Sequence, residues 1–455
     1  MNDYQILGLR DLISLFLYTL LYLINRNRIR KITNNEFHLF EKGLCIWLIG
    51  NSSFFLLFYL YYGWGDTFNY YFYGLHLLRY LIDYPSAFLE IYFSDDISQL
   101  SLVSYPYYSF MPNVLLMNNH ANFFVAKVIS IGLIFTLGSY ITLSFILTLF
   151  SFTGCWLIYT VFRNLYPAIS SLLYYSTLLL PNLIFWGNGI TKEALYFGGM
   201  GFTFFNFYRY FILKQKGGSV IILIISGSYI IYSVKSYVFY CFFPSLLLWI
   251  LLRYSYQDKR SQKMALLLLF SIILFTLGLS LVFDFNSLIS SLAINSILES
   301  AQNYGNQVYE LSEISDGSSY TLSEFEPSVS GTIGIIPEII STALFRPYIW
   351  EIKKPINLFN ALEGLLLMGT LIYLFIKIGI WTIAKIIIKS PNILFCFAFS
   401  LIFLTGVGIS SLNFGALVRY KLPGEVFFIV GLCIIYHEGC QKLKLNEENN
   451  TIYYN

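Results

Sequence analysis

The sequence predicts an all-α, polytopic membrane protein with about 11 transmembrane helices. Hydrophobic residues make up 57% of the 455 residues and charged residues only 12%, whereas a soluble chain of this length would carry far more polar surface. The mean hydropathy is +0.64. Apolar stretches of about 20 residues recur along the chain, and each can cross a hydrocarbon core of roughly 30 Å.

The predicted transmembrane segments begin close to the N-terminus. The first segment, 9–25, is followed by the basic run from Arg26 to Lys31 and not by a small-residue cleavage site. We therefore expect no cleavable signal peptide here, and we expect the basic run to be a cytoplasmic anchor. We find no internal repeat and no soluble domain of appreciable size, and residues 1–455 are expected to form a single transmembrane domain. The segments are 9–25, 43–62, 139–162, 168–183, 193–213, 219–234, 237–253, 264–283, 357–378, 391–411 and 425–437.

The basic residues orient these segments, because Lys and Arg concentrate on the cytoplasmic side of a membrane. Most of the 28 Lys and Arg residues fall in clusters at alternate segment ends. About 11 crossings then place the N-terminus outside and the C-terminus inside the cytoplasmic membrane. The clusters are Arg26/Arg28/Arg30/Lys31/Lys42, Arg163, Arg209/Lys214/Lys216, Arg253/Lys259/Arg260/Lys263, Lys377/Lys385/Lys389 and Lys442/Lys444.

Residues 122–137 are apolar enough to cross the membrane, but a crossing there would invert the clusters that follow as far as Arg260. We therefore expect an interfacial or re-entrant helix on the outer face, with Lys127 near the water. The alternative is that 122–137 crosses and another segment does not.

Two large outer loops result, 63–121 and 284–356, each with interfacial helices and each rich in carboxylates. The first opens with "GWGDTFNYYFYG" (63–74), which places Asp66 at the outer boundary of the membrane. Tyr70 would share the face of Asp66 if this stretch is helical, because it follows at i+4. Shorter outer segments are 184–192, the turn at Lys235, and 412–424.

Positive charge is scarce on the outer side, so its exceptions are informative. Arg346 lies in "ALFRPYIWEIKKP" (343–355), and Arg419 and Lys421 lie in "NFGALVRYKLPGE" (413–425). An arginine fork binds phosphate or carboxylate in bidentate fashion, so these cations suit a lipid-linked diphosphate. The alternative is charge pairing with the acid-rich loop 284–356.

A third feature is "PNLIFWGNGITKEAL" (181–195), in which Lys192 and Glu193 open a helix after a glycine-rich turn. A helix N-terminus offers unpaired N–H groups to an anion. Glu193 could also simply stabilise the helix dipole, whereas Lys192 opposes it.

These segments resemble the GT-C superfamily of integral-membrane glycosyltransferases, which includes O-antigen-polymerase-like proteins. "GDTFNYY" (65–71) is similar to the acid of the family's first outer loop, "GNGITKE" (187–193) to its second acid, and "FRPYIWE" (345–351) and "NFGALVRYKLP" (413–423) to outer arginine segments. The resemblance implies catalytic roles for Asp66 and Glu193 and polyisoprenyl-linked sugars as substrates. The chain differs from the family by the helix 9–25, which precedes the helix before the acid.

The expected function is glycosyl transfer from a lipid-linked sugar or oligosaccharide at the outer face, as a transferase or repeat-unit polymerase in surface polysaccharide or glycoconjugate assembly. Asp66 would act as base. Tyr70, Lys192, Arg346, Arg419 and Lys421 would bind substrate. Alternatives are a transporter or flippase of the same lipid-linked glycan, and a non-catalytic component that binds a protein partner through loop 284–356. Transporters place ionisable groups in mid-membrane helices, and the predicted helix centres carry little charge apart from Glu363.

The six cysteines show no CxxC spacing, so neither a disulfide framework nor a zinc site is expected. No metal-binding motif is present, and a divalent cation as cofactor is left open. The lipid bilayer is the expected environment, and nucleic acid is not an expected partner.

Overall fold

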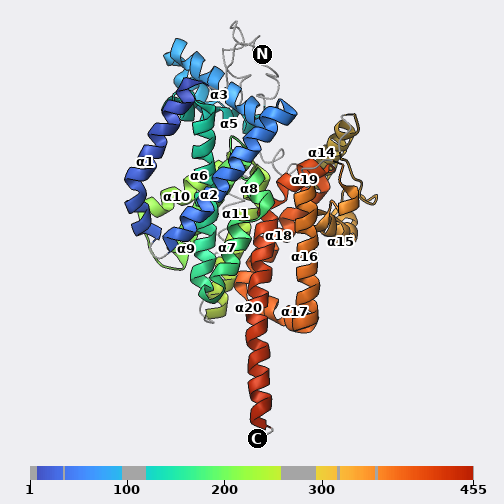
Figure 1. Cartoon of the computed structure of the whole chain (residues 1–455). Helices are drawn as coiled ribbons and strands as arrows, with labels where there is room; N and C mark the ends of the chain where they lie inside the picture. Colours follow the sequence, from blue (N-terminus) through green and yellow to red (C-terminus); the bar gives the residue numbers. More distant parts are fainter. Residues whose placement is uncertain are drawn as a thin grey trace, which may run out of the picture. The chain divides into compact units, whose positions relative to one another are not determined.

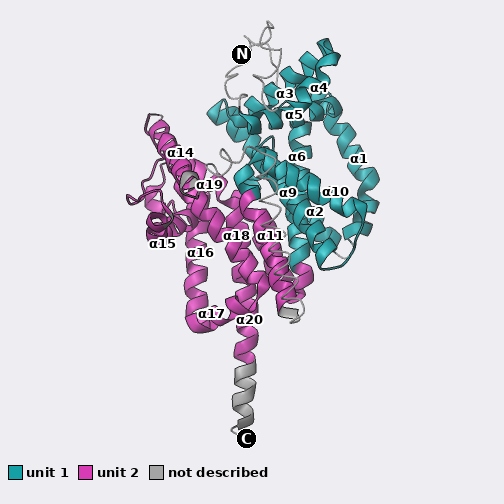
Figure 2. Cartoon of the chain, turned by 180° about the vertical axis from the view of Figure 1, so that it is seen from behind, with its two compact units in different colours: residues 1–162, 183–239 teal, residues 163–182, 240–455 magenta. Residues whose placement is uncertain are grey.

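A computed structural model describes residues 8–33, 36–94, 119–257, 294–314, 318–353 and 357–453. Within these ranges every regular element is a helix, and the β contact between Ser319 and Asn413 is an isolated bridge. The predicted all-α class is confirmed. The described residues form two compact units, 1–162 with 183–239 and 163–182 with 240–455 (Figure 2).

Several described helices are long and apolar enough to cross a membrane, which supports a multi-pass membrane protein. These six candidates are Phe37–Tyr62, Tyr140–Leu165, Ser236–Ser255, Asn357–Ile378, Pro391–Ser410 and Leu422–Lys444. The larger count of about 11 stays a prediction, and its segment 264–283 lies outside the described residues. The predicted single helix 168–183 is wrong, because it ends at Leu178 and a new helix begins at Pro181. Proline disfavours the helical conformation in the residue that precedes it, which here is Leu180.

Unit 1 is built from long helices joined at their ends (Figure 1). α3 is followed by a 3₁₀ turn, Pro85–Ala87, and by the short helix α4. A π-helical segment, Leu57–Tyr62, extends α2. The helices are α1 (Leu9–Thr33), α2 (Phe37–Leu56), α3 (Asp66–Asp83), α4 (Phe88–Phe93), α5 (His120–Phe135), α6 (Tyr140–Leu165), α9 (Lys192–Phe211) and α10 (Gly218–Val234). α8 (Pro181–Trp186) and α11 (Ser236–Gln257) contain unit boundaries.

Glycines set the close helix crossings of unit 1. A Cβ at Gly154 of α6 would lie 2.2 Å from the carbonyl oxygen of Phe197 in α9, and a Cβ at Gly199 of α9 would lie 2.8 Å from the carbonyl oxygen of Gly227 in α10. Such contacts leave no room for a side chain. Small residues at crossings let helix backbones approach closely, which is how helices pack in lipid, where apolar burial alone gives no driving force.

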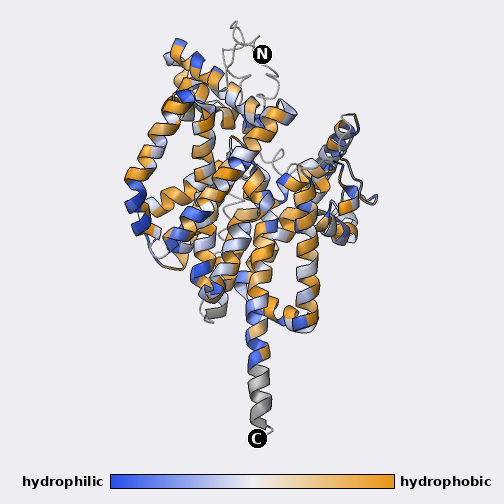
Figure 3. Ribbon diagram, in the orientation of Figure 1, coloured by the Kyte–Doolittle hydropathy of each residue, from blue (hydrophilic) through white to orange (hydrophobic). Residues whose placement is uncertain are grey.

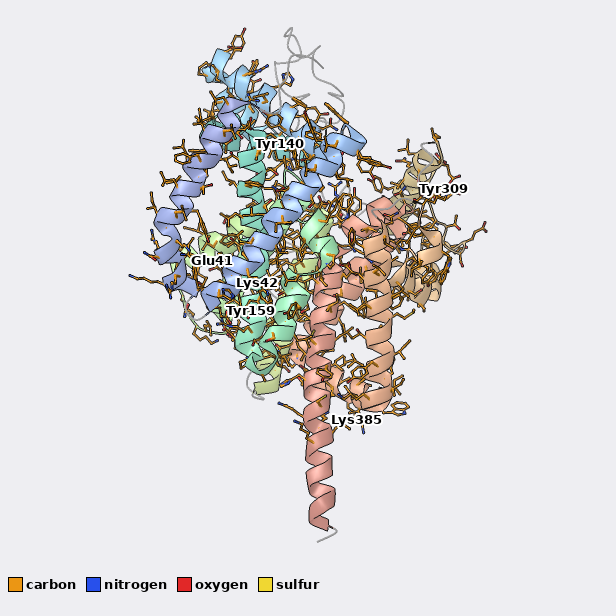
Figure 4. All side chains as sticks on the ribbon, in the orientation of Figure 1. Glu41, Lys42, Tyr140, Tyr159, Tyr309 and Lys385 are labelled. Carbon is orange, nitrogen blue, oxygen red and sulfur yellow. The ribbon has the colours of Figure 1, made fainter. Side chains whose placement is uncertain are left out.

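Polar contacts distinguish the two ends of unit 1. At one end the Thr67 and Tyr140 hydroxyls lie 2.7 Å apart, and Arg10 donates to the Tyr71 hydroxyl at 3.2 Å. At the other end Arg26 pairs with Glu41 at 2.6 Å, and Figure 4 shows Lys42 beside this pair and Tyr140 far from it. The basic cluster that includes Arg26 and Lys42 therefore lies at the end opposite to the start of α3.

α5 corresponds to the ambiguous segment 122–137. With 16 residues it is among the shorter apolar helices, and it packs against α3 and α10. The expectation that Lys127 lies near the water is wrong, because its exposed fraction is 8%. Its ammonium group donates to the carbonyl oxygens of Tyr92 at 3.4 Å and Ser94 at 2.6 Å. Whether α5 crosses the membrane stays a prediction.

Unit 2 contains a bundle in which α20 packs against α7, α16 and α18. Figure 1 shows α14, α15 and α19 at one end of this bundle and α17 at the other, and Figure 3 shows apolar residues predominating along α16 and α18. The helices are α7 (Ser170–Leu178), α14 (Ile294–Ile314), α15 (Val329–Phe345), α16 (Asn357–Ile378), α17 (Ile380–Lys389), α18 (Pro391–Ser410), α19 (Phe414–Tyr420) and α20 (Leu422–Tyr453).

Candidate functional site

Asp66 is the first residue of α3, and its side chain is exposed. Gly63, with φ of 68°, lets the chain leave α2. The Trp64 indole N–H then donates to the Asn69 side-chain oxygen at 2.7 Å, which fixes the turn against α3. A carboxylate in the first helical turn stabilises the helix dipole. The position therefore suits both an accessible base and a helix-stabilising acid.

Tyr70 lies one turn after Asp66 and is buried, with its hydroxyl donating to the Asn122 side-chain oxygen at 3.2 Å. The Lys192 ammonium lies 6.0 Å from the centroid of the Tyr70 ring. The structure thus brings together two of the predicted substrate-binding residues, Tyr70 and Lys192, from segments that are far apart in the sequence.

The segment before α9, 184–192, was expected on the outer side of the membrane, and the structure shows it largely buried against α6. The Gly189 N–H donates to the Thr148 hydroxyl at 3.0 Å, and the Ser151 hydroxyl donates to the carbonyl oxygen of Gly187 at 2.5 Å. Thr148 lies about 12 Å along α6 from its first residue, at roughly 1.5 Å per residue. The break between α8 and α9 therefore packs against the middle of α6.

Glu193, predicted as a second catalytic acid, is fully buried and forms an ion pair with Lys235. The Lys235 ammonium lies 2.9 Å from Glu193 Oε1 and 5.3 Å from the centroid of the Tyr196 ring. A buried pair of this kind costs desolvation and is stable only while both partners are present. Lys235 was seen in the sequence only as a cation at an outer turn, and no sequence signal links it to an acid 42 residues earlier.

In unit 2, the predicted outer segments are joined by backbone hydrogen bonds. The N–H of Tyr320 donates to the carbonyl oxygen of Leu412 at 3.2 Å, and the N–H of Phe414 donates to the carbonyl oxygen of Ser318 at 2.8 Å. The rings of Tyr320 and Phe414 consequently stack with centroids 4.9 Å apart. Part of loop 284–356 is thereby attached to the segment that precedes α19.

Arg346 lies against this ring pair, and we call Arg346, Glu351, Tyr320 and Phe414 the arginine–aromatic cluster. Its guanidinium carbon lies 5.2 Å from the centroid of each ring. Its Nε donates to Glu351 Oε1 at 3.0 Å and Oε2 at 3.1 Å. This pairing within loop 284–356 is the alternative that the sequence left open for Arg346. Its Nη2 also pairs with Glu351 Oε1 at 2.5 Å, and among the described residues no acceptor bonds to Nη1.

The other two predicted cations behave differently. Lys421 is fully buried, with its ammonium 3.5 Å from Glu425 Oε1 and 3.4 Å from the carbonyl oxygen of Leu344. Arg419 is partly exposed in the last turn of α19, and its guanidinium carbon lies 5.9 Å from the centroid of the Tyr420 ring. Lys421 therefore supports the end of α15 from inside, whereas Arg419 lies nearer the surface.

Throughout the described ranges, no three His, Cys, Asp or Glu side chains gather as a metal ion would require. Comparison with protein-family models, with curated proteins and with solved structures gives no match. The site is therefore interpreted from its own chemistry.

The Glu193–Lys235 pair gives the first prediction. Lys235→Met leaves a buried, uncompensated carboxylate, which costs about 3–5 kcal/mol. The thermal unfolding midpoint of the purified protein should fall sharply, and the double variant Glu193→Gln/Lys235→Met should recover most of the loss. Lys216→Met, at an exposed lysine, is the matched control. A single variant as stable as the wild type would contradict the structural role.

Proposed function

We propose that the protein is an integral-membrane glycosyltransferase of the cytoplasmic membrane. It transfers a sugar or oligosaccharide from a polyisoprenyl phosphate or diphosphate at the outer face, in assembly of a surface polysaccharide or glycoconjugate. The observation that carries this proposal is the arginine–aromatic cluster. It combines a guanidinium, which binds phosphate oxygens, with the rings of Tyr320 and Phe414 at the end of the unit 2 bundle.

The reaction divides into two tasks. The acceptor hydroxyl attacks the anomeric carbon and gives its proton to a carboxylate, for which Asp66 is the proposed base. The bond from the anomeric carbon to the lipid phosphate breaks, and its electron pair leaves with the phosphate, which cations stabilise. Arg346 and Arg419 are proposed for this task. Glu193 and Lys421, both buried in ion pairs, are assigned to positioning.

The proposed topology follows from the basic residues, with the N-terminus outside and the C-terminus in the cytoplasm. Support comes from unit 1, where the basic cluster around Arg26 and the start of α3 lie at opposite ends (Figure 4).

Transport of a lipid-linked glycan is a second candidate, and a specific observation favours it. The buried Glu193–Lys235 pair lies beside a helix break that packs against the middle of α6. Interrupted helices and ionisable groups inside the membrane are typical of transporters. Both residues of the pair lie at helix ends, in the first turn of α9 and just after α10, so the expectation that helix centres carry little charge, which weighs against transport, stays a prediction.

Topology is tested by cysteine labelling. In a variant that lacks the six native cysteines, Glu324→Cys should react with an impermeant maleimide in intact cells, because Glu324 belongs to outer loop 284–356 and is exposed. Gln215→Cys, also exposed, should react only after lysis. Labelling of Gln215→Cys from outside would invert the topology and remove the basis for an outer-face site.

The role of Arg346 is tested by Arg346→Lys. Lysine keeps the charge but loses the bidentate fork, so transfer from a lipid-linked donor should fall about 10- to 100-fold, the equivalent of roughly 1.5–3 kcal/mol. Lys353→Gln, which removes an exposed charge from the same loop, should retain activity. Unchanged transfer by Arg346→Lys would return this residue to a purely structural role with Glu351.

The role of Asp66 is tested by Asp66→Asn. The amide keeps the shape and removes the base, so product should fall about 10²- to 10⁴-fold while protein levels stay normal. Asp66→Glu should retain some activity, and Asp83→Asn, at the other end of α3, is the matched control. Wild-type glycan from Asp66→Asn would end the catalytic assignment. If charge changes in 310–326 then remove product, the loop acts instead as a docking surface.

Transfer and transport are separated with purified protein. A glycosyltransferase releases lipid phosphate and forms a new glycosidic bond with synthetic donor and acceptor in detergent, where no gradient or sidedness exists. A transporter leaves both substrates unchanged.

A further inference from the structure

A polar cluster inside unit 2 supplies neither the base nor the cations of the two tasks above, although its Lys421 is assigned to positioning. It contains Glu363 of α16, Glu425 and Lys421 around the start of α20, and the amides of Asn182 and Asn360. Glu425 is 1% exposed, Lys421 is fully buried and Glu363 is partly buried. We call these five residues the carboxylate cluster.

The oxygens of Glu363 are already satisfied. The backbone N–H of Asn182 donates to Glu363 Oε1 at 2.9 Å, and the Asn182 side-chain amide donates to Glu363 Oε2. The same amide donates to the Asn360 side-chain oxygen at 3.1 Å. These bonds hold Glu363 in place from the N-terminal end of α8.

Glu425 is only half satisfied. Its Oε1 lies 3.5 Å from the Lys421 ammonium, whereas its Oε2 is buried and has no hydrogen-bond partner in the part of the chain that the structure describes. An unpartnered carboxylate oxygen away from water costs free energy. Oε2 is therefore the one open position in the cluster.

The charges of the cluster do not balance. Glu363 lies within electrostatic reach of both Glu425 and Lys421, so two carboxylates share one ammonium. The neighbouring helices carry other ionisable groups. Glu338 bonds to the Ser323 N–H, Glu351 to Arg346, and Glu438 to Tyr166 and Ser390. Arg419 precedes Lys421 by two residues and lies near the Tyr420 ring. The remaining groups, on α7, α16, α17, α18 and the later part of α20, are Tyr174, Tyr175, Tyr373, Lys377, Lys385, Lys389, Cys396, Cys433, Tyr436, His437, Cys440, Lys442 and Lys444.

On the two helices that carry Glu363 and Glu425, Lys377 and His437 are remote from the cluster. Lys377 follows Glu363 by 14 positions, about 21 Å along a helix, and His437 follows Glu425 by 12, about 18 Å. Lys421 is the cation that pairs with Glu425, and Glu363 is the second carboxylate within electrostatic reach of it. The cluster therefore needs one further positive charge in an environment with little water.

We propose that the carboxylate cluster binds one exchangeable proton, which resides on Glu425 Oε2 in the folded protein. A proton fits better than a metal ion because a cation such as Ca²⁺ takes six to eight oxygen ligands. Here only one oxygen is open, since the Glu363 oxygens and the Asn360 oxygen already accept hydrogen bonds.

The proton site is connected to the arginine–aromatic cluster. Lys421 donates to the carbonyl oxygen of Leu344, and Asn360 donates to the carbonyl oxygen of Arg346 at 3.0 Å. When the proton leaves, the extra negative charge attracts the Lys421 ammonium more strongly. This attraction weakens the hydrogen bond from Lys421 to the carbonyl oxygen of Leu344, which precedes Arg346 by two residues. This inference is independent of glycosyl transfer, because the same site would serve a protein that transports the glycan.

The test is infrared spectroscopy of the purified full-length protein in lipid nanodiscs. At about pH 7 the wild type should show the C=O stretch of a protonated carboxyl group, and the band should disappear as the pH rises. Glu425→Gln should lose this band. Glu363→Gln should lose it as well, because one carboxylate then balances Lys421. Glu310→Gln, at an exposed acid of α14, should keep it. A band that survives in both cluster variants overturns the proposal.

Thermal unfolding gives a second readout that does not depend on activity. A proton bound only by the folded state stabilises it at low pH, and this stability is lost as the pH rises through the site's titration. In choline chloride, the wild-type midpoint should therefore fall from about pH 5 to about pH 9, and this fall should be absent in Glu425→Gln. Stabilisation of the wild type by sodium chloride at fixed pH, absent in Glu425→Gln, would contradict proton binding and indicate a sodium site instead. A pH dependence shared by wild type and Glu425→Gln would reduce the cluster to a fixed ion pair.

Discussion

The cost of leaving a charge without a partner away from water governs this structure. In the described ranges three lysines are buried, and each contacts oxygen acceptors. Lys127 binds the carbonyl oxygens at the end of α4, Lys235 binds Glu193, and Lys421 binds Glu425 and the end of α15. Each lysine thereby connects elements that the helical pattern alone would leave independent. Polar residues that are exceptions in an apolar sequence thus make the contacts that join helices to one another.

Close helix packing makes these attachments possible. In unit 1 the glycines of α6, α9 and α10 let backbones touch, and the resulting short distances allow the start of α9 to meet Lys235 at the end of α10. In lipid the apolar faces of helices gain little from burial against one another, so small residues and polar contacts decide which helices associate. The break before α9 is held in the same way, by a hydrogen bond that the Thr148 hydroxyl of α6 accepts and one that the Ser151 hydroxyl donates.

In unit 2 a small number of polar contacts likewise determines the structure at the end of the bundle. Backbone hydrogen bonds attach residues 318–320 to the segment before α19, and this attachment presents two stacked rings to Arg346. Arg346 is both a structural partner of Glu351 and a group whose Nη1 has no acceptor among the described residues, so structural and functional readings of this residue need not compete. The layer beneath it, from Lys421 to Glu363, carries more negative than positive charge. A cation-bearing surface supported by a proton-sensitive layer is an arrangement that either transfer or transport could use.

The amino-acid sequence alone predicts the helical membrane class, the approximate ends of α6, α9, α10, α16 and α18, and the segments in which unusual charges lie. Hydrophobic runs, proline and glycine act locally along the chain, so their consequences can be read without a structure. It also singled out Arg346, Lys192 and Tyr70. Only the tertiary structure decided their partners. It placed Lys235 against Glu193, buried Lys127 and Lys421, packed the break before α9 against the middle of α6, and brought Tyr320 and Phe414 to Arg346. These outcomes depend on which helices pack together, and the energy of an ion pair or a ring contact depends on distance in space, which separation along the chain does not encode.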